Sequence, residues 1–247
     1  MRIPIPLVLL LLAGCASAAP GARTGDEPAR ILARAIEHAG GAEALERARG
    51  LVWDADATVH AGGRTVPISG RWAIQPPDSA VVSTYAVERG PSTMRHLVLA
   101  APRGWLVNAN GFAPMPPLML ASEKEEFYFY SAMRLVTLRA PGVTLTALPP
   151  DSTGHRGILA RNPGRPDVEL YVDATGRLSR VRARIHDATT GNPVVQEAWL
   201  SGEIENSGVR WPRIMRLTQD GAPFFDLTLK TFRVLPAIQD TLLAGPR

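Results

Sequence analysis

The chain has 247 residues, 45% of them hydrophobic, and a formal net charge of +4. This length suits one large β domain or two small ones with a core that needs no disulfide, and the chain has a single cysteine, Cys15. All but two of its 27 basic residues are arginine, without a run of like charge, so the composition does not favour nucleic-acid binding. No apolar stretch after Cys15 is long enough to span a membrane.

The N-terminal segment predicts export and lipidation. Arg2 precedes the apolar run of residues 7–15, which is too short for a membrane-spanning helix and typical of a secretory signal peptide. The run ends in Leu12-Ala-Gly-Cys15, which resembles the lipobox of bacterial lipoproteins. The resemblance implies that residues 1–14 are removed and that Cys15 carries diacylglycerol and palmitate chains, a stable anchor. An ordinary signal peptide cleaved a few residues later is the alternative.

The residue after that cysteine bears on the membrane to which the protein is sorted. Ala16 stands where an Asp would imply retention at the inner membrane, which favours the outer membrane and the periplasm. Residues 15–25 are small and polar and are expected to form a tether, and residues 26–247 are expected to form a single domain.

The domain is expected to begin with helices. Asp26 is a plausible N-cap, and apolar residues then recur at helical spacing until Gly40-Gly41 ends the helix. A second short helix is predicted for residues 42–49. A third is predicted for residues 118–138, where neither Pro nor Gly occurs and Glu123, Glu125 and Glu126 follow the start. We expect these glutamates to face water, although they are also candidates for a general acid and base.

The rest of the domain alternates apolar and polar residues with a period of two, which indicates strands joined by hairpins. The strands predicted before the long helix are 51–59, 66–74, 79–89, 93–100 and 105–108. Those predicted after it are 143–148, 155–161, 167–173, 178–187, 194–205, 209–219 and 223–234. A sheet of about ten strands with one apolar face must curl around something, and the apolar helices are the candidates.

This succession of elements resembles the LolA/LolB-like outer-membrane lipoprotein carriers. The segments Ala35-Ile-Glu-His-Ala-Gly-Gly-Ala-Glu-Ala-Leu45, Tyr171-Val-Asp-Ala-Thr-Gly-Arg-Leu178 and Gly208-Val-Arg-Trp-Pro212 are similar to parts of uncharacterised lipoproteins of that fold. The resemblance implies a mostly β, α+β fold, in which a curled antiparallel sheet forms an unclosed β-barrel with the N-terminal and mid-chain helices in its concave mouth. It also implies that acyl chains bind in an apolar cavity between them. We match neither a membrane-inserting loop nor a cavity arginine of the carriers.

Aromatic and methionine side chains supply the candidates for such a cavity. They are Trp53, Trp72, Phe112, Met119, Phe127, Tyr130, Met133 and Trp199, all of which also suit a filled core. The arginines of one strand face are candidates for contact with lipid headgroups or a protein partner, or form a solvated face: Arg180, Arg182 and Arg184.

Catalytic motifs are not found in the sequence, and its five histidines lack metal-ligand spacing, so neither a metal nor a cofactor is expected. We expect a monomeric, non-enzymatic lipoprotein of the outer membrane that binds a lipid or another hydrophobic ligand. One alternative is a structural lipoprotein with a filled core that binds a protein partner through its sheet. The other is an unrecognised hydrolase, for which a carboxylate and a histidine converging in a polar pocket would be the sign.

Overall fold

A computed structural model describes residues 27–245 of the chain. Cys15 and the predicted tether lie outside the described residues. Within this range two helices come first, α1 (Glu27–His38) and α2 (Ala42–Arg47), and a long helix, α3 (Pro117–Met133), interrupts the strands. None of the helices in this part of the chain is both long and apolar enough to cross a membrane.

The described strands form one antiparallel sheet made of two meanders. The first meander contains β1 (Gly50–Ala61), β2 (Arg64–Gln75), β3 (Ser79–Ala86), β4 (Arg95–Ala100), β5 (Arg103–Asn108) and β6 (Gly111–Pro114). The second contains β7 (Thr144–Leu148), β8 (Arg156–Arg161), β9 (Val168–Val172), β10 (Leu178–His186), β11 (Pro193–Asn206), β12 (Val209–Gln219) and β13 (Ala222–Leu229). Antiparallel pairing of β1 with β13 joins the meanders, and β14 (Arg233–Leu235) pairs with the start of β1.

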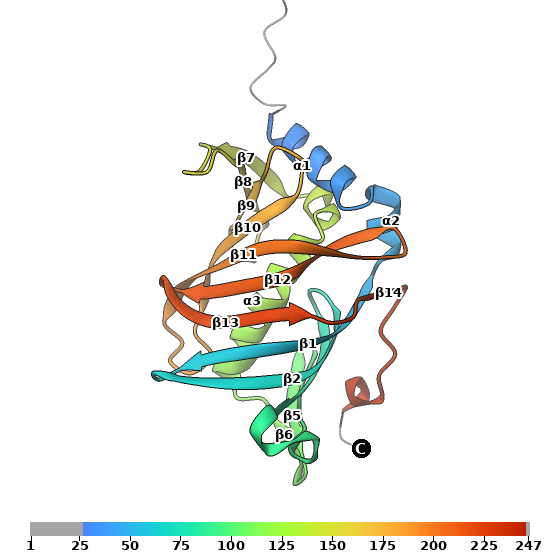
Figure 1. Ribbon diagram of the computed structural model, residues 1–247, viewed down its shortest axis with the longest axis vertical. Coiled ribbons are helices and arrows are strands. Elements are labelled where there is room, and N and C mark those ends of the chain that lie inside the picture. Colours follow the sequence, from blue (N-terminus) through green and yellow to red (C-terminus); the bar gives the residue numbers. More distant parts are fainter. Residues whose placement is uncertain (1–26, 246–247) are drawn as a thin grey trace, which may run out of the picture.

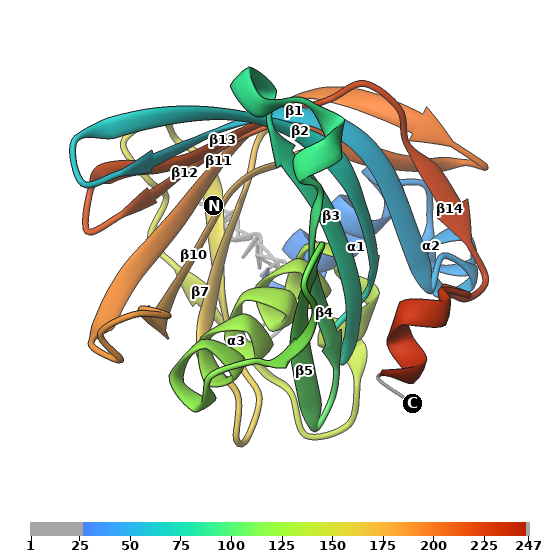
Figure 2. The same ribbon diagram turned by 90° about the horizontal axis from the view of Figure 1, so that it is seen from below.

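This strand order leaves β6 and β7 at the two ends of the sheet, so the barrel is not closed. The long helix α3 connects these two edge strands, and it runs inside the curve of the sheet (Figure 1). Figure 2 shows α3 from below, with β3 to β5 on one side of it and β7 and β10 on the other. Helix α1 packs against β7 and β8 at the upper end of the sheet. The predicted curled sheet that holds helices in its concave mouth is therefore confirmed.

Alternation along the strands sets which side chains form the core. In β10 the buried residues are Val181, Ala183 and Ile185. Leu51, Trp53 and Ala55 of β1 are likewise buried, at 1% exposure or less. Because these side chains come from the concave face, the core lies between the sheet and α3.

Three expectations about the elements need correction. The sheet has fourteen strands in the described residues where about ten were expected, and the short β6 was missed. The long helix ends at Met133 rather than at residue 138, because Leu135 adopts a φ of 60° and a 3₁₀ turn follows at Val136–Arg139. The strand expected at 223–234 is broken after Leu229, since the N–H groups of the next two residues donate to the carbonyl of Asp54.

Candidate functional site

Helix α3 brings an aromatic face to the middle of the half-barrel. Its second half is apolar on every side, with Phe127, Tyr128, Phe129, Tyr130 and Met133 all buried. A helix without a polar face is stable only where protein covers it all round. The concave sheet supplies that cover, which explains why this segment lies inside the curve.

The interior around α3 is filled with rings. The Trp53 ring centroid lies 6.0 Å from that of Tyr130 and 6.3 Å from that of Trp211. Trp211 in turn stacks on Phe232 at 6.1 Å, and Tyr130 also contacts Phe127 at the same distance. In the conformation described, α3 and the sheet thus bury each other's apolar surface.

The structure brings together most of the aromatic residues proposed for the cavity. Those buried in one core cluster are Trp53, Trp72, Phe127, Tyr130 and Met133. Met119 is partly buried near the start of α3. Their role toward a ligand stays a prediction.

Two of the proposed cavity residues do not line the concave face. Phe112 and Trp199 are 43% and 42% exposed. Phe112 lies on the edge strand β6, which is exposed throughout. Trp199 lies between buried Ala198 and Leu200 on β11, so alternation turns its side chain to the outer face. The prediction that these two residues line the interior is wrong.

The expectation that the α3 glutamates face water is wrong for two of them. Glu123 and Glu126 are partly buried, and burial raises the pKa of Glu123 to about 8 and that of Glu126 to about 7. Glu126 accepts a hydrogen bond from the amide of Gln196, a fully buried residue of β11. Both carboxyl groups are consequently harder to ionise than the carboxyl group of an exposed glutamate.

The third of these glutamates binds the end of β10. The backbone N–H of His186 donates to Glu125 at 2.7 Å, and the Nδ1 atom of the same histidine lies 2.9 Å from the carboxylate. Together with the hydrogen bond from Gln196, this contact links the first half of α3 to the second meander through polar groups.

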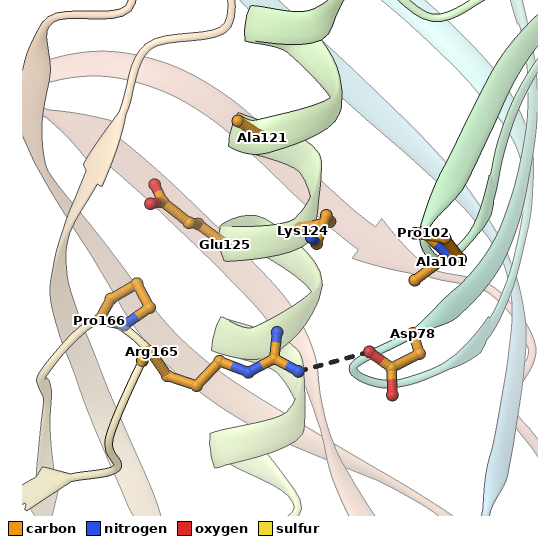
Figure 3. A pocket seen from close by; sticks show the side chains of 9 residues that line it. Asp78, Ala101, Pro102, Ala121, Lys124, Glu125, Arg165 and Pro166 are labelled. Carbon is orange, nitrogen blue, oxygen red and sulfur yellow. Dashed lines mark hydrogen bonds and ion pairs between the residues drawn. The ribbon is translucent and has the colours of Figure 1, made fainter.

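A cleft opens beside the first half of α3 (Figure 3). Its volume is about 680 Å³. It is lined by Asp78, Ala101 and Pro102 from turns of the first meander, by Ala121, Lys124 and Glu125 from α3, and by Gly164, Arg165 and Pro166 from the β8–β9 loop. Arg165 Nη2 lies 3.4 Å from Asp78 Oδ1, and its guanidinium lies 5.5 Å from the Tyr128 ring centroid. This ion pair connects the two meanders beside α3.

The three arginines of β10 differ in their surroundings. Arg180 is held by ion pairs of 3.2 Å to Asp151 and to Glu197, and its guanidinium lies 3.9 Å from the Tyr171 ring centroid. Arg182 pairs with Glu169 at 2.9 Å. Arg184 is exposed. Arg180 is therefore part of a packed outer cluster rather than a freely solvated side chain.

A serine, a histidine and an aspartate meet on this outer face, but not as a catalytic relay. Ser179 Oγ lies 2.8 Å from His155 Nδ1, and Asp151 Oδ2 lies 4.0 Å from the same nitrogen. A relay needs the acid and the serine at different ring nitrogens. Ser179 is 7% exposed in a β-bulge, and its hydroxyl donates to the Tyr171 carbonyl. The cluster fixes the loop before β8, and residues 27–245 contain no group of side chains suited to a metal ion.

Solved structures show which fold this is. An outer membrane lipoprotein-sorting protein domain from Vibrio parahaemolyticus is 9% identical and has a TM-score of 0.54, with 89% of this chain and 97% of that chain covered. A LolA superfamily protein from Nitrosomonas europaea is 11% identical at a TM-score of 0.54, with 87% and 96% covered. A DUF1329 family protein from Desulfovibrio piger is 10% identical at a TM-score of 0.52, over the same shares.

The chain thus has a LolA-like fold. No family model matches its sequence, and no curated protein matches it.

Sequence reasoning missed several residues that shape this site. Arg134 was not singled out, and it is buried at the end of α3. Gln196 was missed too, although its place between apolar neighbours at a period of two indicated an inward side chain. Asp78 and Arg165 lie far apart in the sequence, so only the tertiary structure reveals the ion pair between them.

Proposed function

We propose that the protein is a lipid-anchored envelope protein that binds acyl chains or another hydrophobic ligand on the concave face of its half-barrel. The observation that carries this proposal is the position of α3, which covers that face with an aromatic surface. Acyl chains bind through contact with apolar walls and need no hydrogen bonds, so the aromatic and aliphatic residues under α3 suit them. In this account α3 is a cover that moves when ligand enters.

The way in which α3 is held supports such movement. Its first half contacts the second meander through polar groups, namely the contacts of Glu125 with His186 and of Glu126 with Gln196. Carboxyl groups in a half-buried site weaken the docking of a helix, because their ionised form is poorly solvated there. The cleft lined by Lys124 and Glu125 leaves space beside this half of the helix.

The proposed anchor is the acylated Cys15, and the proposed location is the periplasmic face of the outer membrane. The lipobox resemblance supports the anchor, and the shared fold of an outer membrane lipoprotein-sorting domain supports an envelope location. We propose a binding role without enzymatic activity, in keeping with the geometry around Ser179.

Crosslinking tests whether α3 must move. Cysteines replace Glu125 and His186, whose accessible side chains contact each other, and a short bismaleimide joins them in the full-length protein. Native mass spectrometry from nonionic detergent measures the binding of 1-palmitoylglycerol. The crosslinked protein should not bind it, because α3 then covers the apolar wall permanently.

The two singly substituted proteins, treated with the same reagent, are the controls and should still bind. Undiminished binding by the crosslinked protein would contradict the movement of α3. Failure of the unsubstituted protein to bind any amphiphile would contradict the proposed function itself.

The packed interior favours one second candidate, a lipoprotein that binds a protein partner through its outer sheet face. The exposed residues of that face include Trp199 and Arg184, whereas Arg180 and Arg182 are already ion-paired. Loss of a co-purifying protein in the Trp199→Ala and Arg184→Ala variants, with no lipid bound to the unsubstituted protein, would favour this candidate.

A further inference from the structure

Arg134, just beyond the end of α3, is a buried cation without a carboxylate partner. The residue as a whole is 8% exposed. Its side chain forms one hydrogen bond, which Nη2 donates to the carbonyl of Leu45 at 3.1 Å. The buried Nε has no hydrogen-bond partner. None of the ion pairs formed within residues 27–245 involves this guanidinium. Burial of a charge without an opposite charge is strongly unfavourable.

The surroundings of Arg134 compensate this charge only in part. Leu45 lies in the last turn of α2, where carbonyl groups carry at most about half a negative charge. Burial lowers the pKa of Arg134, and the nearby positive charge of Arg49 lowers it further. Arg49 itself is exposed. A helix-capping role therefore explains the Nη2 hydrogen bond, but it does not compensate the neighbouring positive charges of Arg134 and Arg49.

Aromatic side chains lie near this end of α3, because Trp211 lines one small cavity together with Met133 and Leu135, the two sequence neighbours of Arg134. Tyr130 precedes Arg134 by one helical turn, on the same side of α3, and contacts Trp53. The rings of Trp53 and Trp211 stack on each other, and the indole N–H group of each is also buried without an acceptor. This end of the core thus combines aromatic surface with unpaired donors, which suits an amphiphile with an acceptor-rich head.

We propose that Arg134 binds the anionic head group, a carboxylate or a phosphate, of an amphiphile whose apolar part occupies the concave face. The inference rests on the proposed function and adds the class of ligand to it. A guanidinium pairs with either anion through two parallel hydrogen bonds. The exposed Arg49 attracts an anionic head group to this end of the core. A neutral head group would leave the buried charge of Arg134 unpaired.

The test compares three ligands with the same acyl chain on the full-length protein, by native mass spectrometry from nonionic detergent. They are palmitate, palmitoyl lysophosphatidylglycerol and the neutral 1-palmitoylglycerol. The two anions should bind at least about tenfold more tightly than the neutral ligand. Arg134→Gln should abolish this preference and leave the affinity for 1-palmitoylglycerol unchanged, while Arg134→Lys should retain part of it. The matched control Arg139→Gln, at an exposed arginine paired with Glu46, should bind as the unsubstituted protein does.

The ligand comparison on the unsubstituted protein decides the matter even where an Arg134 variant does not fold. Equal affinity for all three ligands overturns the head-group inference and leaves the proposed function standing. Failure of all three to bind overturns the proposed function and the inference with it. A preference for the anions that survives in a folded Arg134→Gln protein overturns the assignment to Arg134.

Discussion

A single glycine lets α1 lie against the sheet. Gly40 has a φ of 121°, and a Cβ atom built on it would lie 1.9 Å from the carbonyl oxygen of Gly208, in the β11–β12 turn. Two hydrogen bonds hold the chain at this contact, because Arg210 donates to the carbonyls of His38 and Ala39. Gly40→Ala should lower the free energy of unfolding by about 2 kcal/mol or more, measured by chemical denaturation.

The adjacent Gly41 provides the matched control for this prediction. Its φ is 87°, but a Cβ atom there would meet nothing within 4 Å. Gly41→Ala therefore introduces backbone strain alone, and the loss should be about 1 kcal/mol. Equal losses in the two variants would show that the close approach to Gly208 is not what holds α1.

Two partly buried carboxyl groups of α3, those of Glu123 and Glu126, make stability depend on pH. An exposed glutamate has a pKa near 4.5, whereas burial disfavours the anion and raises the pKa of Glu126 to about 7 and that of Glu123 to about 8. Between these values the folded state binds more protons than the unfolded state, so the free energy of unfolding falls as pH rises. Gln196 and Tyr130 face these carboxyls, and neither glutamate is ion-paired within the described residues.

The Glu126→Gln variant should therefore lose part of this pH dependence. The difference in the free energy of unfolding between this variant and the unsubstituted protein should change in favour of the variant by about 2 kcal/mol from about pH 5 to about pH 8. Glu125→Gln, one position earlier and paired with His186, controls for loss of a helix carboxylate and should keep the decline. Denaturation at the two pH values measures both, and identical slopes in all three proteins would contradict the burial of Glu126.

At the scale of elements, the sequence predicts those parts of the fold that local patterns determine. Period-two alternation and turn residues located the strands on both sides of α3, and the apolar second half of α3 indicated cover on several sides. The same reasoning failed where tertiary contacts decide. The strand expected to reach residue 234 is broken because the chain after Leu229 bonds to Asp54 of β1. No local sequence pattern predicts this contact between the chain after Leu229 and Asp54.

The element α3 shows most clearly why site chemistry is harder to predict than fold. A run of acidic residues near a helix start is typical of a solvated face, yet all three glutamates are partly buried, and burial raises the pKa of Glu123 and Glu126. The burial of Arg134 was likewise not predicted. Local patterns miss both features because the connection between β6 and β7 passes through the concave side, which the strand order determines and a local sequence window does not.

At the scale of the whole molecule, the open sheet and its internal helix form one unit. The two meanders meet along β1 and β13, and their free edges are linked through α3. The proposed movement of α3 would therefore expose the concave face without unpairing strands. The ion pair of Arg165 with Asp78 spans the meanders beside α3. A rigid wall with a movable cover would suit the proposed binding of a hydrophobic ligand.

Hydrogen–deuterium exchange of the full-length protein, with and without bound palmitate, tests whether α3 is a movable cover. If it is, α3, residues 117–133, should exchange faster when palmitate is bound, and the protection of β1, β12 and β13 should be unchanged. Palmitate bound with the exchange of α3 unaltered would contradict a movable cover.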